Sequence, residues 1–131
     1  MSRENVDVVR RFYDAYERND RDGLRRLLSA DVEFIPLGAK LMGGSARGVD
    51  RVLQNITEFG ASFASYDVRP ERFHEAGDHV VTVLHRSARS ARSPAPIEDR
   101  FAQLFSLRDG RVVRIQSFRR VEDALEAAGS T

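Results

Sequence analysis

The sequence lacks several residue types on which common kinds of site depend. It has no cysteine and no tryptophan, and only 3 of its 131 residues are histidine. A disulfide framework, a thiolate nucleophile and a cysteine-ligated metal are therefore excluded, and three scattered histidines argue against a dedicated zinc site. No apolar run approaches the length of a membrane span, and the N-terminus mixes charges with valines where a signal peptide is apolar. We expect a cytoplasmic protein with no metal, no organic cofactor and no membrane partner.

Charge of neither sign is in excess. The chain has 21 basic and 20 acidic residues and a net charge of +1 at pH 7, so it has no general attraction to nucleic acid. The arginines of RSARSARSPAP, residues 86–96, are not interleaved with the aromatic residues that stack on bases. We predict a solvated hairpin loop there and no nucleic-acid partner. The length and a hydrophobic content of 41% fit one folded domain over residues 1–131.

Three amphipathic helices are predicted in the first half of the chain. Apolar residues recur at three- and four-residue steps over residues 3–18 and again over 49–59, which is the helical period. Between them, Asp20 can cap a short second helix. Gly60 stands where a left-handed cap would end the third helix.

The second half of the chain reads as strands. Alternating apolar residues predict strands over 66–75, 79–87, 97–107 and 112–118, after an earlier short strand over 32–35. Asp109-Gly110 between the last two is a strong hairpin signal. A last helical segment is expected over 121–128, and the glycine-rich stretch 37–48 is expected to be an irregular loop, suited to a lid or pocket rim. Helices followed by hairpin-connected strands predict an α+β fold, with helices on one face of a curved antiparallel sheet.

Three stretches of the chain carry a resemblance to a known family. They are VVRRFYDAYERNDRDGLRRLLSADVEFIP, GVDRVLQNI and RFAQLFSLRDGRVVRIQSF. With them the whole chain resembles one SnoaL-like domain, of the polyketide cyclase-like group in the nuclear transport factor 2-like superfamily. The resemblance implies a cone-shaped, cystatin-like sheet wrapped around the N-terminal helices, an apolar ligand-binding pocket and a homodimer formed through the outer face of the sheet. It implies no single activity.

Two chemistries of this superfamily fit the sequence poorly. Ketosteroid isomerases use a tyrosine, an aspartate base and a protonated aspartate, and the matching positions are Phe12, about Ile35, and Gln103. Limonene epoxide hydrolases use an Asp-Arg-Asp arrangement, which Asp99 and Arg100 would leave incomplete because the last strand offers no second carboxylate. Activity has to be argued from such site residues and not from the fold, so we disfavour both reactions.

A third chemistry is testable here. SnoaL-like cyclases use an aspartate and a histidine for proton transfer next to a carbonyl. If the loop after His85 is centred on Arg92, His85 lies opposite Asp99, close enough for a catalytic dyad. The other interpretation is an exposed polar pair near a strand end. Strand alternation also places Asp99 on the same face of the sheet as Gln103, the face that the resemblance assigns to the cavity.

The sequence thus predicts a small-molecule site with two open functional alternatives. The pocket residues are expected to be Phe12, Tyr16, Phe34, Phe101, Gln103 and Phe105. The predicted ligand is a small hydrophobic metabolite. The protein is then either a cofactor-free cyclase, isomerase or hydrolase, with His85 and Asp99 as its catalytic residues, or a non-catalytic ligand-binding or dimeric interaction module.

Overall fold

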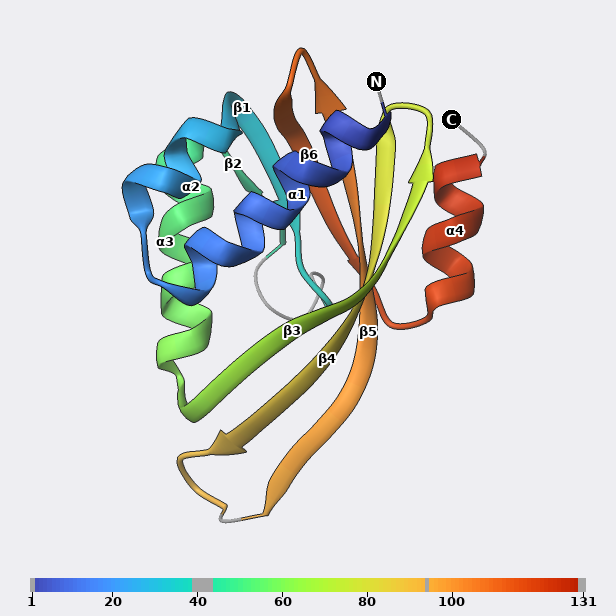
Figure 1. The fold of residues 1–131 in the computed structure, drawn as a ribbon. Coiled ribbons are helices and arrows are strands. Elements are labelled where there is room, and N and C mark those ends of the chain that lie inside the picture. The colour runs from blue at the N-terminus through green and yellow to red at the C-terminus, as the bar shows by residue number, and fades with distance from the viewer. Residues whose placement is uncertain (1, 39–43, 94, 130–131) are drawn as a thin grey trace.

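Helices and strands follow one another in an α+β order in the computed structural model, which describes residues 2–38, 44–93 and 95–129. The elements are α1 (Ser2–Glu17), α2 (Arg21–Leu27), β1 (Leu28–Ile35), β2 (Ala46–Arg47), α3 (Val49–Ala61), β3 (Phe63–Ala76), β4 (His79–Ser90), β5 (Pro96–Arg108), β6 (Arg111–Phe118) and α4 (Val121–Gly129). Figure 1 shows the long strands β3, β4 and β5 curving past the helices. The predicted fold class is confirmed.

Six strands form one sheet in the order β2-β1-β6-β5-β4-β3. Neighbouring strands are antiparallel except β1 and β6, which run parallel, with Phe34 opposite Ile115. The sheet is therefore antiparallel, as predicted, except at this one pair. Within the described residues, none of the helices is long and apolar enough to cross a lipid bilayer.

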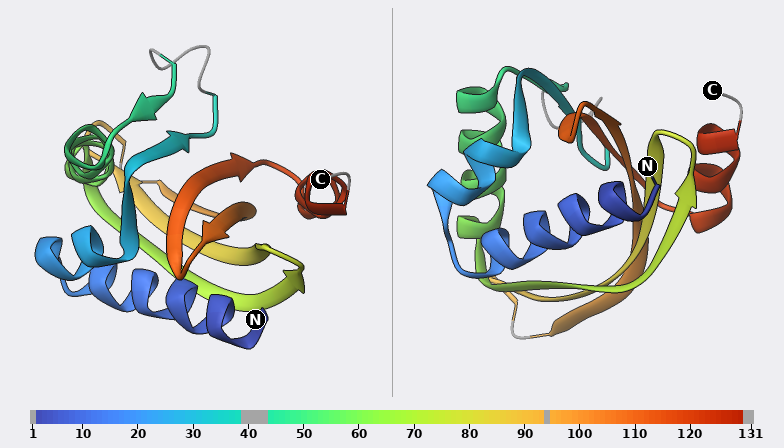
Figure 2. Two further views of the ribbon diagram at one scale, coloured as in Figure 1. Left: turned by 90° about the horizontal axis from the view of Figure 1, so that it is seen from above. Right: turned by 45° about the horizontal axis from the view of Figure 1, so that its top comes forward.

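Helices cover both faces of the sheet. Figure 2 shows α4 separated by the sheet from α1, α2 and α3. On the inner face, Phe12 of α1 packs edge-to-face on Phe105 of β5, with ring centroids 5.3 Å apart. On the outer face, Ala124 and Ala128 of α4 pack with a small cluster that includes Leu104. Successive residues of a strand point to opposite faces of the sheet. Since helices cover both faces here, the consecutive residues at the centre of β4 are all buried.

The local signals of the sequence are confirmed at two of three positions. Asp109 and Gly110 both have positive φ, 54° and 77°, and join β5 to β6, as a two-residue hairpin turn of type I′ requires. The Asp20 carboxylate caps α2 by accepting a hydrogen bond from the Gly23 amide at 2.9 Å. Gly60, however, lies inside α3, whose C-cap is Ser62, so its predicted role as a left-handed cap is wrong.

The hairpin of β4 and β5 differs most from the sequence prediction. Both strands extend into the Arg-Ser segment, so most of it is strand and not loop. Arg89 pairs with Pro96, and the register therefore sets His85 opposite Arg100 and Arg86 opposite Asp99. The midpoint of the connection falls between Arg92 and Ser93, whereas the sequence prediction assumed a midpoint at Arg92. A slip of one residue moves side chains to the other face of a sheet.

The glycine-rich stretch 37–48 was predicted to be irregular and lid-like. It contains the two-residue strand β2, which pairs with β1 through Ala46 and Phe34. Residues 39–43 lie outside the described residues, so the lid prediction for them stays untested.

Candidate functional site

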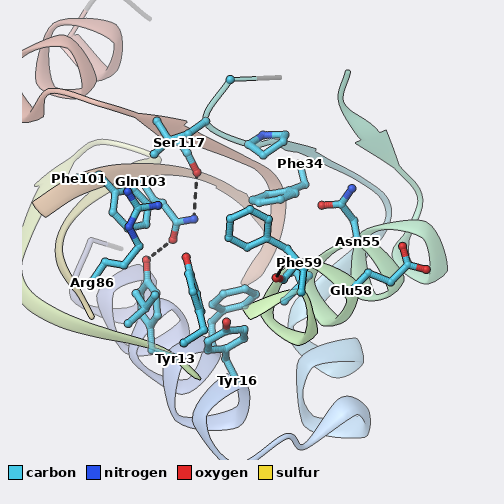
Figure 3. Close-up of a pocket in the computed structure, with 18 of the residues that line it drawn as sticks. Tyr13, Tyr16, Phe34, Asn55, Glu58, Phe59, Arg86, Phe101, Gln103 and Ser117 are labelled. Atoms are coloured by element: carbon cyan, nitrogen blue, oxygen red, sulfur yellow. Dashed lines mark hydrogen bonds between the residues drawn. The ribbon is translucent and has the colours of Figure 1, made fainter. Parts of the chain in front are cut away.

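A cavity of about 540 Å³ opens between α1, α3 and the inner face of the sheet. Figure 3 shows aromatic rings from α1, β1 and α3 gathered around it, with polar side chains at two sides. Its aromatic lining comprises Phe12, Tyr13, Tyr16, Phe34, Phe59, Tyr66 and Phe101. Its polar lining comprises Asn55, Glu58, Ser62, Arg86, Gln103, Ser117 and Arg119. A mainly apolar cavity with a few polar groups is the usual form of a small-molecule site.

The structure brings five of the six predicted pocket residues to this cavity. The residues at its wall are Phe12, Tyr16, Phe34, Phe101 and Gln103. Phe105 is fully buried and is not among the lining residues, because the rings of Phe12 and Tyr13 pack against it, 5.3 and 5.7 Å away between centroids. Its assignment as a pocket residue is corrected to the core. Whether the other five contact a ligand stays a prediction.

A chain of hydrogen bonds crosses the inner wall of the cavity from α1 to β6. The Tyr13 hydroxyl donates to Gln103 Oε1 at 2.7 Å, and Gln103 Nε2 donates to Ser117 Oγ at 3.1 Å (Figure 3). We call these three residues the Tyr13–Gln103–Ser117 relay. The Ser117 hydroxyl accepts within the relay, and no other hydrogen bond uses its proton among the described residues. Ser117 therefore has a donor to offer at the cavity wall.

The tyrosine hydroxyls of the cavity stay protonated. Burial raises the pKa of Tyr13 far above its ordinary value, although the nearby Thr82 hydroxyl opposes the rise. Burial, reinforced by repulsion from Tyr66 and Asp67, raises the pKa of Tyr16 to about 12. Thr82 Oγ1 itself is buried without a hydrogen bond of ordinary length to any described residue. The hydroxyls of Tyr13 and Tyr16 can therefore donate hydrogen bonds near neutral pH but cannot act as bases.

Arg86 forms the polar end of the cavity on β4. Its Nε and Nη2 atoms lie 2.8 and 2.6 Å from the two carboxylate oxygens of Asp99, the bidentate geometry that arginine favours. Its guanidinium carbon lies 5.1 Å from the centre of the Phe101 ring, within the range of a cation–π contact. Burial raises the pKa of Tyr66, and its hydrogen bond with Arg86 offsets part of that rise.

The predicted dyad of His85 and Asp99 is not formed. The register puts the two side chains on opposite faces of the sheet, and His85 Nε2 instead lies 2.9 Å from a carboxylate oxygen of Glu98. Asp99 does share the inner face with Phe101 and Gln103, as predicted. The hydrogen bonds from Arg86 lower the pKa of Asp99, which makes its carboxylate a weak base.

An epoxide hydrolase arrangement is not formed around Asp99 either. Arg100 faces the outer side of the sheet, where its Nε lies 2.7 Å from Glu71 Oε1. Asp99 and Arg100 therefore cannot act on one ligand in the cavity. Within the described ranges, no group of three or more His, Asp or Glu residues is arranged to hold a metal ion.

Sequence reasoning missed several polar residues of the cavity. Arg86 was assigned to a solvated loop, and Ser117 was considered only as a missing carboxylate. Tyr66 and Asn55 were not singled out, and the interpretation of Arg119-Arg120 as a solvated face is wrong for Arg119, which lines the cavity. Arg86 lies two residues after Leu84 on β4, so the two side chains point to the same face of the sheet. This places Arg86 at the cavity only once the register of β4 with β5 is known.

Comparison with known proteins gives a consistent result. A family model described as a SnoaL-like domain matches residues 9–115. An uncharacterised protein of Mycobacterium tuberculosis H37Rv is 30% identical over 116 residues, which covers 87% of each chain. The family-model match runs from within α1 into β6.

Solved structures share the fold at low sequence identity. TerC, co-crystallised with polyporic acid, is 19% identical with a TM-score of 0.79, and the match covers 98% of this chain and 99% of that one. A protein of Catenulispora acidiphila with a ketosteroid isomerase-like fold, in complex with trimethylamine, is also 19% identical, with a TM-score of 0.74 and coverage of 93% and 92%. At such identities the likeness establishes the fold alone.

Proposed function

Because this chain belongs to the SnoaL-like domain family, we propose that it binds a small, mainly hydrophobic molecule in the cavity between α1, α3 and the sheet. The ligand has at least one oxygen that accepts hydrogen bonds. Acid–base catalysis by His85 and Asp99 is not part of this proposal, since the two side chains face opposite sides of the sheet.

The Tyr13–Gln103–Ser117 relay is the observation that carries the proposal. A partly buried glutamine in an aromatic wall needs partners for both the oxygen and the nitrogen of its amide, and Gln103 finds them in Tyr13 and Ser117. The relay thereby holds the Ser117 donor at the edge of an apolar space of about 540 Å³. An oxygen of a ligand whose rings or aliphatic groups fill that space can accept from Ser117.

Two structural relatives support binding of small molecules by this fold. TerC was crystallised with polyporic acid and the Catenulispora acidiphila protein with trimethylamine. Both have the same arrangement of helices and sheet as this chain. The capacity of the fold to hold a small molecule is what the proposal takes from them.

A cofactor-free cyclase, isomerase or hydrolase activity is the second candidate, and it depends on Glu58. Glu58 is the acidic residue among those that line the cavity, and it lies on α3. Proton removal next to a carbonyl requires a base within hydrogen-bond reach of the carbon acid. In this version of the function Glu58 is the base and Ser117 donates to the carbonyl oxygen. Loss of turnover in Glu58→Gln with ligand binding retained would support it.

Binding is tested with a neutral probe and a matched pair of variants. Titration of the ¹⁵N-labelled protein with 2-naphthalenemethanol should shift amide signals of cavity residues such as Gln103 and Ser117. Ile56→Trp places extra bulk in the cavity and should weaken binding about tenfold, a loss of ~1.4 kcal/mol. Leu125→Trp, at an exposed position of α4, is the control and should bind as the wild type does. Shifts spread over the surface, or equal binding by both variants, would contradict the proposal.

Homodimerisation and a cytoplasmic location stay part of the proposal. The family resemblance implies a dimer through the outer face of the sheet, and α4 covers this face over Ala102 and Leu104. We place the contact between copies on the uncovered part of the face, where His85 contacts Glu98 and Arg100 contacts Glu71. Light scattering should give twice the monomer mass, and a monomer at working concentration would refute this.

A further inference from the structure

The charges at the cavity wall are unevenly distributed. Arg86 and Arg119 line one part of it, and Asp99 compensates for the charge of Arg86 alone. Arg119 lies near enough to help lower the pKa of Asp99, yet it makes no hydrogen bond or ion pair with another described residue. This end of the cavity therefore has a surplus of one positive charge.

The opposite side of the cavity has the other sign. Glu58 and Asn55 project from α3, and in Figure 3 they lie across the aromatic rings from Arg86. Glu58 accepts a hydrogen bond from Gln54 of the same helix at 2.9 Å. The cavity thus has a positive end at the sheet, an apolar middle and a negative rim at α3.

Donors dominate the positive end. The Gln103 amide is used by the relay, but Ser117 retains its proton. Asp99 accepts from the Arg86 Nε atom and from one Nη2 position, and Tyr66 also hydrogen-bonds to Arg86, which still leaves guanidinium N–H groups on Arg86 for a ligand. Arg119 follows the last residue of β6 and shares its inward side with Ser117. A carboxylate, which only accepts hydrogen bonds, complements such a set of donors.

We infer that the ligand is a hydrophobic carboxylic acid, bound as its anion with the carboxylate between Arg119, Ser117 and Arg86 and its apolar body among the aromatic rings. Asp99 holds the Arg86 guanidinium against Phe101 and leaves Arg119 as the residue that confers selectivity for an anion. This inference rests on the proposed ligand-binding function and adds to it the chemical class of the ligand.

The test compares two probes of nearly equal shape, 2-naphthoate and 2-naphthalenemethanol, by calorimetry at low salt. The wild type should bind the acid at least about tenfold more tightly than the alcohol, since charged hydrogen bonds are stronger than neutral ones. Arg119→Gln should lower this preference to about threefold or less, because it should weaken binding of the acid more than binding of the alcohol. Arg108→Gln, at an exposed position beside the β5–β6 turn, should keep the full preference.

The outcomes separate this inference from the proposed function. Equal affinity of the wild type for both probes would overturn the inference and keep the proposed function. A preference for the acid that survives in Arg119→Gln would also overturn it. Binding of neither probe would contradict the proposed function itself. Raising the salt concentration should weaken binding of the acid alone, because exposed charges such as Arg119 are screened.

Discussion

The hydroxyl of Tyr13 donates a hydrogen bond to Gln103 Oε1 at 2.7 Å and so joins the first helix to the middle of the sheet. The Tyr13 side chain is buried and its ring packs edge-to-face on Phe12 and Phe105. The bond thus fixes both the packing of α1 and the orientation of the amide at the cavity wall.

Tyr13→Phe should destabilise the fold by ~1–2 kcal/mol, because it keeps the ring but leaves Gln103 Oε1 without its donor in a partly buried site. Urea denaturation measures the change in free energy of unfolding. Tyr16→Phe is the matched control on the same helix. For its hydroxyl the structure records no hydrogen bond among the described residues, so it should change stability by less than ~0.5 kcal/mol. Equal losses in both variants would argue against the relay.

The register of β4 and β5 makes a prediction about energetic coupling. Arg86 and Asp99 form a bidentate pair with side chains 17% and 42% exposed, so a double-mutant cycle of Arg86→Met and Asp99→Asn should give a coupling of ~0.5–1 kcal/mol, reduced by solvent screening. The cycle of His85→Ala with Asp99→Asn should give a coupling near zero, because these side chains face opposite sides. A larger value for the second cycle would restore the register expected from sequence.

Asp99 should also make stability depend on pH in the acid range. Its pKa is lowered in the folded state, chiefly by hydrogen bonds from Arg86, relative to about 3.9 in an unfolded chain. Its stabilising contribution is then fully present above that value and is lost as the pH falls through the folded pKa. Between about pH 5 and pH 2, the wild type should lose more free energy of unfolding than Asp99→Asn. Equal losses would show that the pair contributes nothing.

The turn between β5 and β6 should depend on Gly110. Its φ of 77° is unfavourable for residues with a Cβ, so Gly110→Ala should cost ~1–2 kcal/mol. Gly129→Ala is the control, since a Cβ there has no described residue within 4 Å apart from its chain neighbours and the backbone of its own helix, and its φ is not positive. Because alanine has a higher helix propensity than glycine, this variant should be neutral or slightly stabilising. Thermal denaturation distinguishes the two, and a tolerated Gly110→Ala would contradict the assigned turn.

Features set by residues close together in the sequence could be predicted, and features set by distant residues could not. Periodicity and turn chemistry are local, so the helices and the Asp109-Gly110 hairpin could be predicted from neighbouring residues, whereas the side of the sheet that faces the cavity came from the family resemblance. The β4–β5 register depends on how many residues of the Arg-Ser segment join the strands, and no local pattern fixes that number. An error of one residue in that number led to the prediction of His85 as the partner of Asp99, whereas the partner in the structure is Arg86.

Phe105 shows a second limit. Strand alternation correctly gives its face, but the depth of a residue along that face is set by the helix that packs over it. Phe12 and Tyr13 cover Phe105 and leave Phe101 and Gln103 at the cavity. Depth of this kind is a tertiary property and has no signature in the strand itself.

The parallel pairing of β1 with β6 bears on how the chain folds during synthesis. Phe34 and Ile115 are neighbours in the sheet, although most of the chain separates them in sequence. The hairpins β3–β4 and β4–β5 can form from nearby residues, whereas β1 has no long partner strand until β6 has left the ribosome. Pairings of such large sequence separation are slow to form. Until β6 pairs with β1, the sheet is incomplete and so is the part of the cavity wall formed by β1. Ligand binding should therefore appear only at the end of folding.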